Sequence, residues 1–290
     1  MPGEYDRLKF EKLNYNSYLK VPELLSLQHL ISDGPHHDEM FFIIIHQASE
    51  LWFKSLLHET GLLVSAFREG SVSRALKVLK RMSAILELLT RQITLLGTLT
   101  PVEFAGFRDK LNPASGFQSA QFRMLEFTFG LRDPFYIRYF ESMPEVSRRL
   151  GEILHSPGVY DEFLSCLAHA GFKVPPDILK GGASTVTGRE PGRDSPRKPH
   201  EGLTRLFKEI YESPRDNFHW VLLFEALLDF DSHMAGWRHH HIQSVSRTIG
   251  AKSGTGGSSG VAFLQGRAAL RFFPELWEVR TIIGGSTYGN

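Results

Sequence analysis

Two of the thirteen histidines lie in strongly apolar surroundings. His46 ends the run Phe41-Phe42-Ile43-Ile44-Ile45-His46. His241 continues a stripe with helical spacing, made of Leu223, Leu227, Phe230, Met234, Trp237 and Val245. The commoner role of such a histidine is structural, with a neighbour satisfying its ring nitrogens. The alternative is that both imidazoles face one cavity, where an imidazole can bind a metal or accept a proton.

An apolar slot between helices with an axial imidazole on one face is what an iron porphyrin needs. The chain has no Cys-x-x-Cys-His motif, so such a haem would be held without thioether links. A zinc site is disfavoured, because there is no His-Glu-x-x-His motif and only one cysteine. The residues from His36 to Glu39 could contribute to a two-His-one-carboxylate iron site. However, they fall where a helix is expected to start, and the helix dipole explains acidic residues there.

Two further features suit a carboxylate. The glycine-rich run Gly254 to Gly260 precedes Val261-Ala262-Phe263-Leu264, so it would bring backbone N–H groups and hydroxyls to the start of a helix. No Gly-Lys-Ser/Thr follows it and no strand precedes it, which excludes the nucleotide-binding loops. Arg108 lies among apolar residues and could clamp the same anion through two hydrogen bonds. Each feature also has a simpler explanation when taken alone: the glycine-rich run could be a flexible linker, and Arg108 could be a surface arginine.

The elements that must position these residues are helices. Apolar residues at 76, 79, 82, 86, 89, 93 and 96 predict a helix from Arg74 to Leu99. Other long helices are expected over Asp38 to Arg68, Arg215 to Ile249, and from Ser119 past Phe129. Shorter ones are expected around Glu145 to His155, Tyr160 to Ala170 and Leu203 to Tyr211. No stretch alternates with period two, so we predict an all-α fold: one helical-bundle domain, 1–290, with long helices around the pocket.

The remaining composition sets limits on partners and location. The net charge of +1 gives no field that would draw nucleic acid or an anionic membrane. Cys166 is the only cysteine, and the first twenty residues contain no apolar run of the kind that a signal peptide needs. We therefore expect a soluble cytoplasmic protein. The segment 181–200 is rich in Gly, Pro, Ser and charge, so we expect a flexible surface loop there.

Several motifs together resemble the tryptophan 2,3-dioxygenase family, in order from about Leu13 to Arg280. They are His36-His37-Asp38-Glu39-Met40 through His46-Gln47, Glu50-Leu51-Trp52-Phe53-Lys54, Leu99-Thr100-Pro101, Phe107-Arg108, Pro113 through Ser119, Ile249-Gly250, and Gly254 through Gly260. The motifs at Ser115 to Ser119 and Gly254 to Gly260 are long and specific. The resemblance implies a helical homotetramer that uses haem b (iron protoporphyrin IX). It would cleave the indole C2–C3 bond of L-tryptophan with O2 to give N-formyl-kynurenine, in the kynurenine pathway of tryptophan catabolism.

The resemblance also implies roles for individual residues. His241 matches the axial iron ligand, and His46 matches the distal histidine that meets the indole N–H. The other matched positions bind substrate: Phe42 and Phe104 against the indole, Arg108 at the carboxylate, Thr255 at the ammonium and carboxylate end, and Ser115 with Gly116 near dioxygen. Tyr15, Tyr18 and Leu19 match an N-terminal motif that, in the family, reaches into a neighbouring subunit's pocket.

The chain departs from the family pattern at two positions. Some relatives carry Tyr at the position of Phe104, so one hydroxyl contact to the carboxylate would be absent here. Ile93 stands where some bacterial relatives have Trp. Two other functions remain open: a family sibling that inserts one oxygen atom into a tryptophan derivative in secondary metabolism, and a non-catalytic haem sensor. The sensor leaves Arg108 and the glycine-rich run unexplained. A third alternative is a helical interaction protein with buried structural histidines.

Overall fold

The computed structural model describes residues 13–34, 36–181, 198–254 and 260–284. Within these residues the regular elements are α-helices and short 3-10 helices, with no strand, which confirms the predicted all-α fold. In the same residues, no helix is long and apolar enough to cross a membrane. Of the predicted loop at 181–200, residues 182–197 lie outside the described part of the chain.

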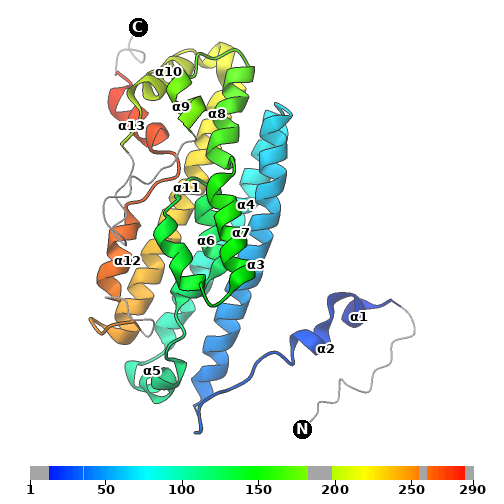
Figure 1. Cartoon of the computed structure of the whole chain (residues 1–290), viewed down its shortest axis with the longest axis vertical. Helices are drawn as coiled ribbons and strands as arrows, with labels where there is room; N and C mark the ends of the chain where they lie inside the picture. Colours follow the sequence, from blue (N-terminus) through cyan, green and yellow to red (C-terminus); the bar gives the residue numbers. More distant parts are fainter. Residues whose placement is uncertain (1–12, 35, 182–197, 255–259, 285–290) are drawn as a thin grey trace.

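Three long helices form the body of the molecule: α3 (His37–Arg68), α4 (Val72–Thr94) and α11 (Pro214–Ile249). α4 packs against both α3 and α11, and Figure 1 shows all three extending along the long axis. The predicted apolar positions of α4 from Leu79 to Ile93 are buried in these two interfaces. The predicted helix 74–99 is right in position, but its last turn tightens into a 3-10 helix, η2 (Leu95–Thr98).

Shorter helices surround these three, and the ones predicted over 145–155, 160–170 and 203–211 are present within about three residues. They are α5 (Pro101–Arg108), α6 (Ala120–Thr128), α7 (Pro144–His155), α8 (Val159–His169), α9 (Pro176–Gly181), α10 (Glu201–Glu212), α12 (Val261–Ala268) and α13 (Pro274–Ile282). Three 3-10 helices connect them: η3 (Asp109–Leu111), η4 (Gly116–Gln118) and η5 (Pro134–Phe140).

The helix α6 ends at Thr128, whereas the sequence predicted that it continues past Phe129. Gly130 adopts a φ of +102°, and the N–H of Leu131 donates to the carbonyl of Glu126 at 2.9 Å. This hydrogen bond across a left-handed glycine terminates the helix, because it satisfies a carbonyl that the next helical turn would otherwise use.

Aromatic rings dominate the centre of the core. Phe129 stacks on Phe230 of α11 with ring centroids 4.6 Å apart, and Phe272, from the segment before α13, lies 4.9 Å from Phe129. All three rings are fully buried. Burying rings of this size contributes about 1.5–3 kcal/mol each relative to an exposed state, so this cluster holds α6, α11 and α13 together. Cys166 is buried in the same core as a free thiol.

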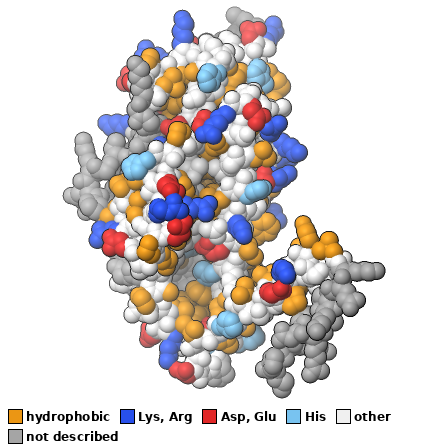
Figure 2. All heavy atoms as spheres, turned by 45° about the vertical axis from the view of Figure 1, so that its right-hand side comes forward, with side chains coloured by type: hydrophobic (Ala, Val, Ile, Leu, Met, Phe, Trp, Pro, Cys, Tyr) orange, Lys and Arg blue, Asp and Glu red, His pale blue; other side chains and the backbone are white. Residues whose placement is uncertain are grey.

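The N-terminal arm, residues 13–32, extends away from the bundle (Figure 1) and carries two short helices, α1 (Tyr15–Leu19) and α2 (Val21–Leu24). Its root is fixed to α3, because the buried carboxylate of Glu39 accepts hydrogen bonds from the backbone N–H groups of Ile31, at 2.7 Å, and Ser32, at 3.2 Å. Figure 2 shows hydrophobic side chains exposed on this arm.

Candidate active site

A cavity opens between α3, α5 and α11, beside the segment that leads into α12. Its lining includes Phe42, His46, Phe104, Arg108, Trp237 and His241. α3 supplies Phe42 and His46, one turn apart on a single face, and α11 supplies Trp237 and His241 in the same way. The structure therefore brings to one cavity two histidines that are 195 residues apart in the sequence.

The side chain of His46 is exposed where it borders the cavity, and the neighbouring protein atoms desolvate its ring. Its Nδ1 atom lies 2.7 Å from the carbonyl oxygen of Phe42. A carbonyl only accepts, so Nδ1 carries the proton and Nε2 keeps a lone pair. Burial lowers the pKa of His46, against the opposing effects of the Phe42 carbonyl and of Glu50. The ring is therefore neutral near pH 7, with an acceptor nitrogen available to a ligand.

His241, on α11, also lines the cavity and stacks on Trp237, with ring centroids 5.4 Å apart and an interplanar angle of 11°. Burial, and to a smaller degree the nearby His46, lowers the pKa of His241 to about 4. A neutral imidazole is the form that binds a metal ion. Its neighbour His239 is exposed, because consecutive residues of a helix point in different directions.

The donor set around His241 fits a haem better than a bare metal ion. Among the described residues, no group of three His, Cys, Asp or Glu side chains could hold an ion. The carboxylate of Glu39, considered above for an iron site, is instead occupied by Ile31 and Ser32. A porphyrin brings four nitrogen ligands of its own and needs only an axial imidazole from the protein. The cavity lining is also mainly apolar, as a porphyrin ring requires.

Aromatic rings form the wall next to His46. The ring centroid of Phe42 lies 4.1 Å from that of His46 and 5.5 Å from that of Phe104. Behind them, the fully buried Phe107 contacts both phenylalanines at centroid distances of 5.7 and 5.2 Å. A flat apolar ligand would find stacking partners here at little entropic cost, since packing already fixes these rings.

The polar end of the cavity lies where α5 meets the segment after α11. Arg108 is half-buried at the end of α5, and its Nη2 atom donates to the carbonyl oxygen of Ser253 at 2.5 Å. Ser115 and Gly116 also line the cavity, and open space surrounds the position of a Cβ on Gly116. Thr255 lies outside the described residues. A second, more open hollow, lined by Asn112, Tyr139 and Ser253, shares Arg108 and Ser115 with the cavity.

Gly260 is the conformationally demanding residue at this end. Its φ is +64°, and a Cβ atom would come within 2.5 Å of the carbonyl oxygen of Lys252. Only glycine fits such a turn without strain. The chain can thus double back on residue 252 just before α12 begins at Val261.

Glu50 was not identified from the sequence as a residue of this site. This carboxylate lies one turn after His46 on α3 and lines the cavity. It accepts from Ser119 Oγ at 2.5 Å and from Gln121 Nε2 at 2.8 Å, and it thereby joins α3 to the start of α6. The i, i+4 spacing from His46 was the available signal.

Tyr15, Tyr18 and Leu19 lie in the projecting arm rather than around this chain's own cavity. Their side chains are 74%, 72% and 45% exposed, so they are available for contact with another molecule.

The helical fold and a cavity with two uncharged imidazoles on separate helices define an all-α protein with a largely apolar ligand site. A family model described as tryptophan 2,3-dioxygenase matches residues 4–157 and 204–283. The tryptophan 2,3-dioxygenase of Arthrobacter sp. strain FB24 is 43% identical over 276 residues, which cover 94% of this chain and 93% of the relative. That of Xanthomonas campestris pv. campestris strain B100 is 42% identical over 283 residues, covering 98% and 91%. The chain belongs to the tryptophan 2,3-dioxygenase family, which confirms the resemblance seen in its motifs.

Proposed function

We propose that this chain, as one domain over residues 1–290, is a haem-dependent dioxygenase. It cleaves the indole C2–C3 bond of L-tryptophan with O2 to give N-formyl-kynurenine. The observation that carries the proposal is the placement of neutral His46 and His241 on separate walls of one apolar cavity. One imidazole is needed to hold the cofactor and the other to meet the substrate, and both are needed in uncharged form.

His241 is the proposed axial ligand of a haem b that is bound without covalent links. The pKa of about 4 keeps its lone pair available at physiological pH. Trp237, stacked on the ring, restricts the rotation of the imidazole about its side-chain bonds. When bound, the haem supplies iron that binds and activates dioxygen. Both oxygen atoms enter the product, so no external reductant is consumed in a turnover.

His46 is the proposed partner of the indole N–H. The hydrogen bond from its Nδ1 to Phe42 leaves Nε2 as the acceptor that this N–H requires. Phe42 and Phe104 would pack against the indole ring and exclude water from it. The contribution of these side chains is orientation, since a reacting bond held in one geometry avoids much of the entropic cost of the reaction.

Arg108 is the proposed clamp for the substrate carboxylate, and Thr255 the proposed contact for the ammonium and carboxylate end. In the structure, the guanidinium group of Arg108 donates a hydrogen bond to a neutral acceptor, the carbonyl oxygen of Ser253. A carboxylate is a stronger acceptor, because hydrogen bonds between charged partners are roughly twice as strong as those between neutral ones. Ser115 and Gly116 would line the part of the pocket nearest dioxygen, where Gly116 leaves open space.

We further propose a cytoplasmic homotetramer in which the arm contributes to a neighbouring subunit's pocket. The exposed apolar side chains of Tyr15, Tyr18 and Leu19 support this arrangement, because an isolated chain would leave them in water. Glu39 holds the root of the arm in a fixed direction. Sedimentation of the haem-loaded protein should give four times the mass of the chain, and a monomer at working concentration would contradict the assembly.

The test of the function is a product assay with reduced, haem-loaded protein, L-tryptophan and air. We expect one N-formyl-kynurenine for each tryptophan consumed. The matched pair is His241→Ala, which should lose the haem on gel filtration, and His239→Ala on the neighbouring exposed position, which should keep it. Haem binding without any product would instead favour the sensor, and a product with an intact ring would favour the sibling that inserts one oxygen.

A further inference from the structure

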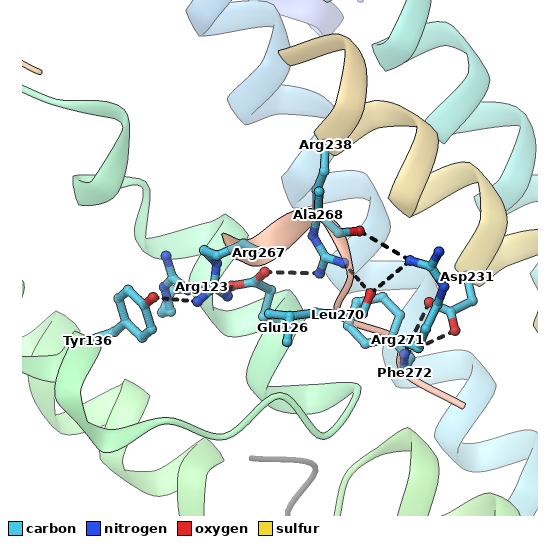
Figure 3. A network of polar contacts seen from close by, with 10 residues as sticks. All are labelled: Arg123, Glu126, Tyr136, Asp231, Arg238, Arg267, Ala268, Leu270, Arg271 and Phe272. Atoms are coloured by element: carbon cyan, nitrogen blue, oxygen red, sulfur yellow. Dashed lines mark hydrogen bonds and ion pairs between the residues drawn. The ribbon is translucent and has the colours of Figure 1, made fainter. Parts of the chain in front are cut away.

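A cluster of buried charges lies on the side of α6 that faces α11 and α12 (Figure 3). At its centre the carboxylate of Glu126, which has no exposed surface, binds three arginines. Its Oε1 accepts from Arg238 Nη2 at 3.0 Å, and its Oε2 accepts from Arg267 Nη2 at 2.7 Å. Arg123 Nη1 also pairs with Oε2. We call these four residues the Glu126 cluster.

The Glu126 cluster is ionised and close to balanced in charge. Burial by itself would raise the pKa of Glu126, but Arg267, Arg123 and Arg238 outweigh it and lower that pKa to about 2. Asp231 lies near enough to Arg238, and Asp133 near enough to Arg267, to interact with their charges. The three guanidinium groups thus have three carboxylates around them, although the Nε atoms of Arg123 and Arg238 are buried without a hydrogen-bond partner among the described residues.

The positions of the partners indicate what the Glu126 cluster connects. Arg238 lies on α11 one turn before His241, and Arg267 lies on α12, seven residues after Gly260. Arg238 Nη1 also donates to the carbonyl of Leu270 at 3.0 Å, beyond the end of α12. By contrast, Arg123 pairs with Glu126 inside α6, three residues earlier. Only Arg238 and Arg267 therefore join separate helices through this carboxylate.

We propose that Glu126 is a positioning residue that fixes α12 against α11 through Arg267 and Arg238. It thereby sets the distance between His241 and the turn at Gly260. Glu126 does not line the cavity, whereas Arg238 and Arg267 both do, so Glu126 acts on the cavity through these two arginines. The inference rests on the proposed function, in which the glycine-rich segment receives the amino acid end of tryptophan. Loosening α12 should then weaken substrate binding more than the bond-making steps.

The experiment compares three variants of the haem-loaded protein. Arg267→Gln removes the tie from Glu126 to α12, together with the hydrogen bond from Arg267 Nη1 to the hydroxyl of Tyr136, and leaves the pairs of Glu126 with Arg238 and Arg123 in place. Arg267→Lys keeps the charge and serves as the conservative rescue. Arg132→Gln is the matched control: Arg132 is also buried and pairs with Asp161 at 2.6 Å, but it joins the end of α6 to α8, away from the cavity.

Hydrogen exchange of the α12 amides, residues 261–268, is the readout that needs no activity. In Arg267→Gln they should exchange about tenfold faster or more, as expected for a helix that opens locally. KM for L-tryptophan should rise about tenfold with kcat within about threefold, the signature of lost binding rather than lost chemistry. Arg267→Lys should recover at least part of both changes. Arg132→Gln should lower the thermal midpoint without altering α12 exchange or KM.

Unchanged α12 exchange in Arg267→Gln would overturn the proposal, and so would a loss of kcat at constant KM. Equal effects of Arg132→Gln on α12 exchange would also overturn it, since buried charge alone would then explain them. A wild-type protein without tryptophan turnover would contradict the proposed function, while the exchange measurement would still decide the part played by the Glu126 cluster.

Discussion

The Nδ1 atom of His46 and the carbonyl oxygen of Phe42 lie 2.7 Å apart, one turn from each other on α3. A backbone carbonyl within the helix therefore selects the tautomer of a side chain in the cavity. The same contact prevents rotation of the ring, and it leaves Nε2 as the only ring atom that can accept a proton from a ligand.

Replacing His46 by Ala removes that acceptor, so we expect kcat for L-tryptophan to fall by about tenfold or more, within the range for loss of a positioned proton acceptor. Turnover should not vanish, because the proposed axial ligand and carboxylate clamp remain. The control is His58→Ala, three turns later on α3 at an exposed position outside the cavity, which should leave kcat unchanged. Equal kcat values for wild type and His46→Ala would show that His46 has no part in the reaction.

Arg108→Ala should weaken binding of L-tryptophan by about 2–5 kcal/mol, the usual cost of losing one partner of a desolvated charge pair. That cost corresponds to a rise in KM of at least about thirtyfold. Tryptamine, which lacks the carboxylate, provides the matched substrate: its kinetics should differ little between wild type and variant. If both substrates lose affinity equally, Arg108 supports the pocket wall through Ser253 and does not bind the carboxylate.

Gly260→Ala should destabilise the protein and raise KM, because an Ala at φ +64° would place its Cβ 2.5 Å from the carbonyl of Lys252. A residue forced into such a conformation costs about 1–3 kcal/mol. Gly266→Ala, six residues later inside α12, is the control, since nothing lies within 4 Å of its Cβ position. That change should stabilise the helix by about 0.5–1 kcal/mol. Equal thermal midpoints for the two variants would show that the turn at 260 tolerates a side chain.

The ionised Glu126 predicts a pH dependence of stability. Its pKa is lowered in the folded protein from the ordinary 4.5 to about 2, so its contribution is complete above pH 4.5. The contribution is lost as the pH falls toward 2, and it amounts to about 3 kcal/mol by linkage. Glu126→Gln should therefore be less stable at pH 7 and lose less free energy of unfolding between pH 4.5 and 2. Denaturant titrations check this, with the exposed Glu141→Gln as a control that should follow the wild type.

The long helices could be predicted because their apolar residues recur at helical spacing over many turns. In α4 the predicted positions from Leu79 to Ile93 are all buried, together with Ala75, Val78 and Ile85. The helix α5 has an equally local signal that was not used: Thr100 and Glu103 form a capping box, and Pro101 is the first helical residue. The α1 and α2 helices carry comparable local signals, a capping box of Asn14 with Ser17 and a proline, Pro22, in the first turn of α2. They are only five and four residues long and contain no buried residue, so periodicity cannot reveal them.

The site was harder to predict than the helices. Motifs brought His46, His241 and Arg108 together as candidates, but their meeting in one cavity depends on how α3, α5 and α11 pack. The Glu126 cluster was not anticipated at all. Arginines on amphipathic helices usually face solvent, and the pairing of Glu126 with Arg238 and Arg267 spans 112 and 141 residues. No local pattern carries that information.

The most direct test of the central claim is isotope labelling of the product with 18O2. Reduced, haem-loaded protein is given L-tryptophan under 18O2, and the product mass is measured. Two labelled oxygen atoms in N-formyl-kynurenine are predicted, because both atoms of one dioxygen molecule enter the opened ring. A single labelled oxygen in a product with an intact indole ring would contradict the dioxygenase function and assign the cavity to monooxygenation.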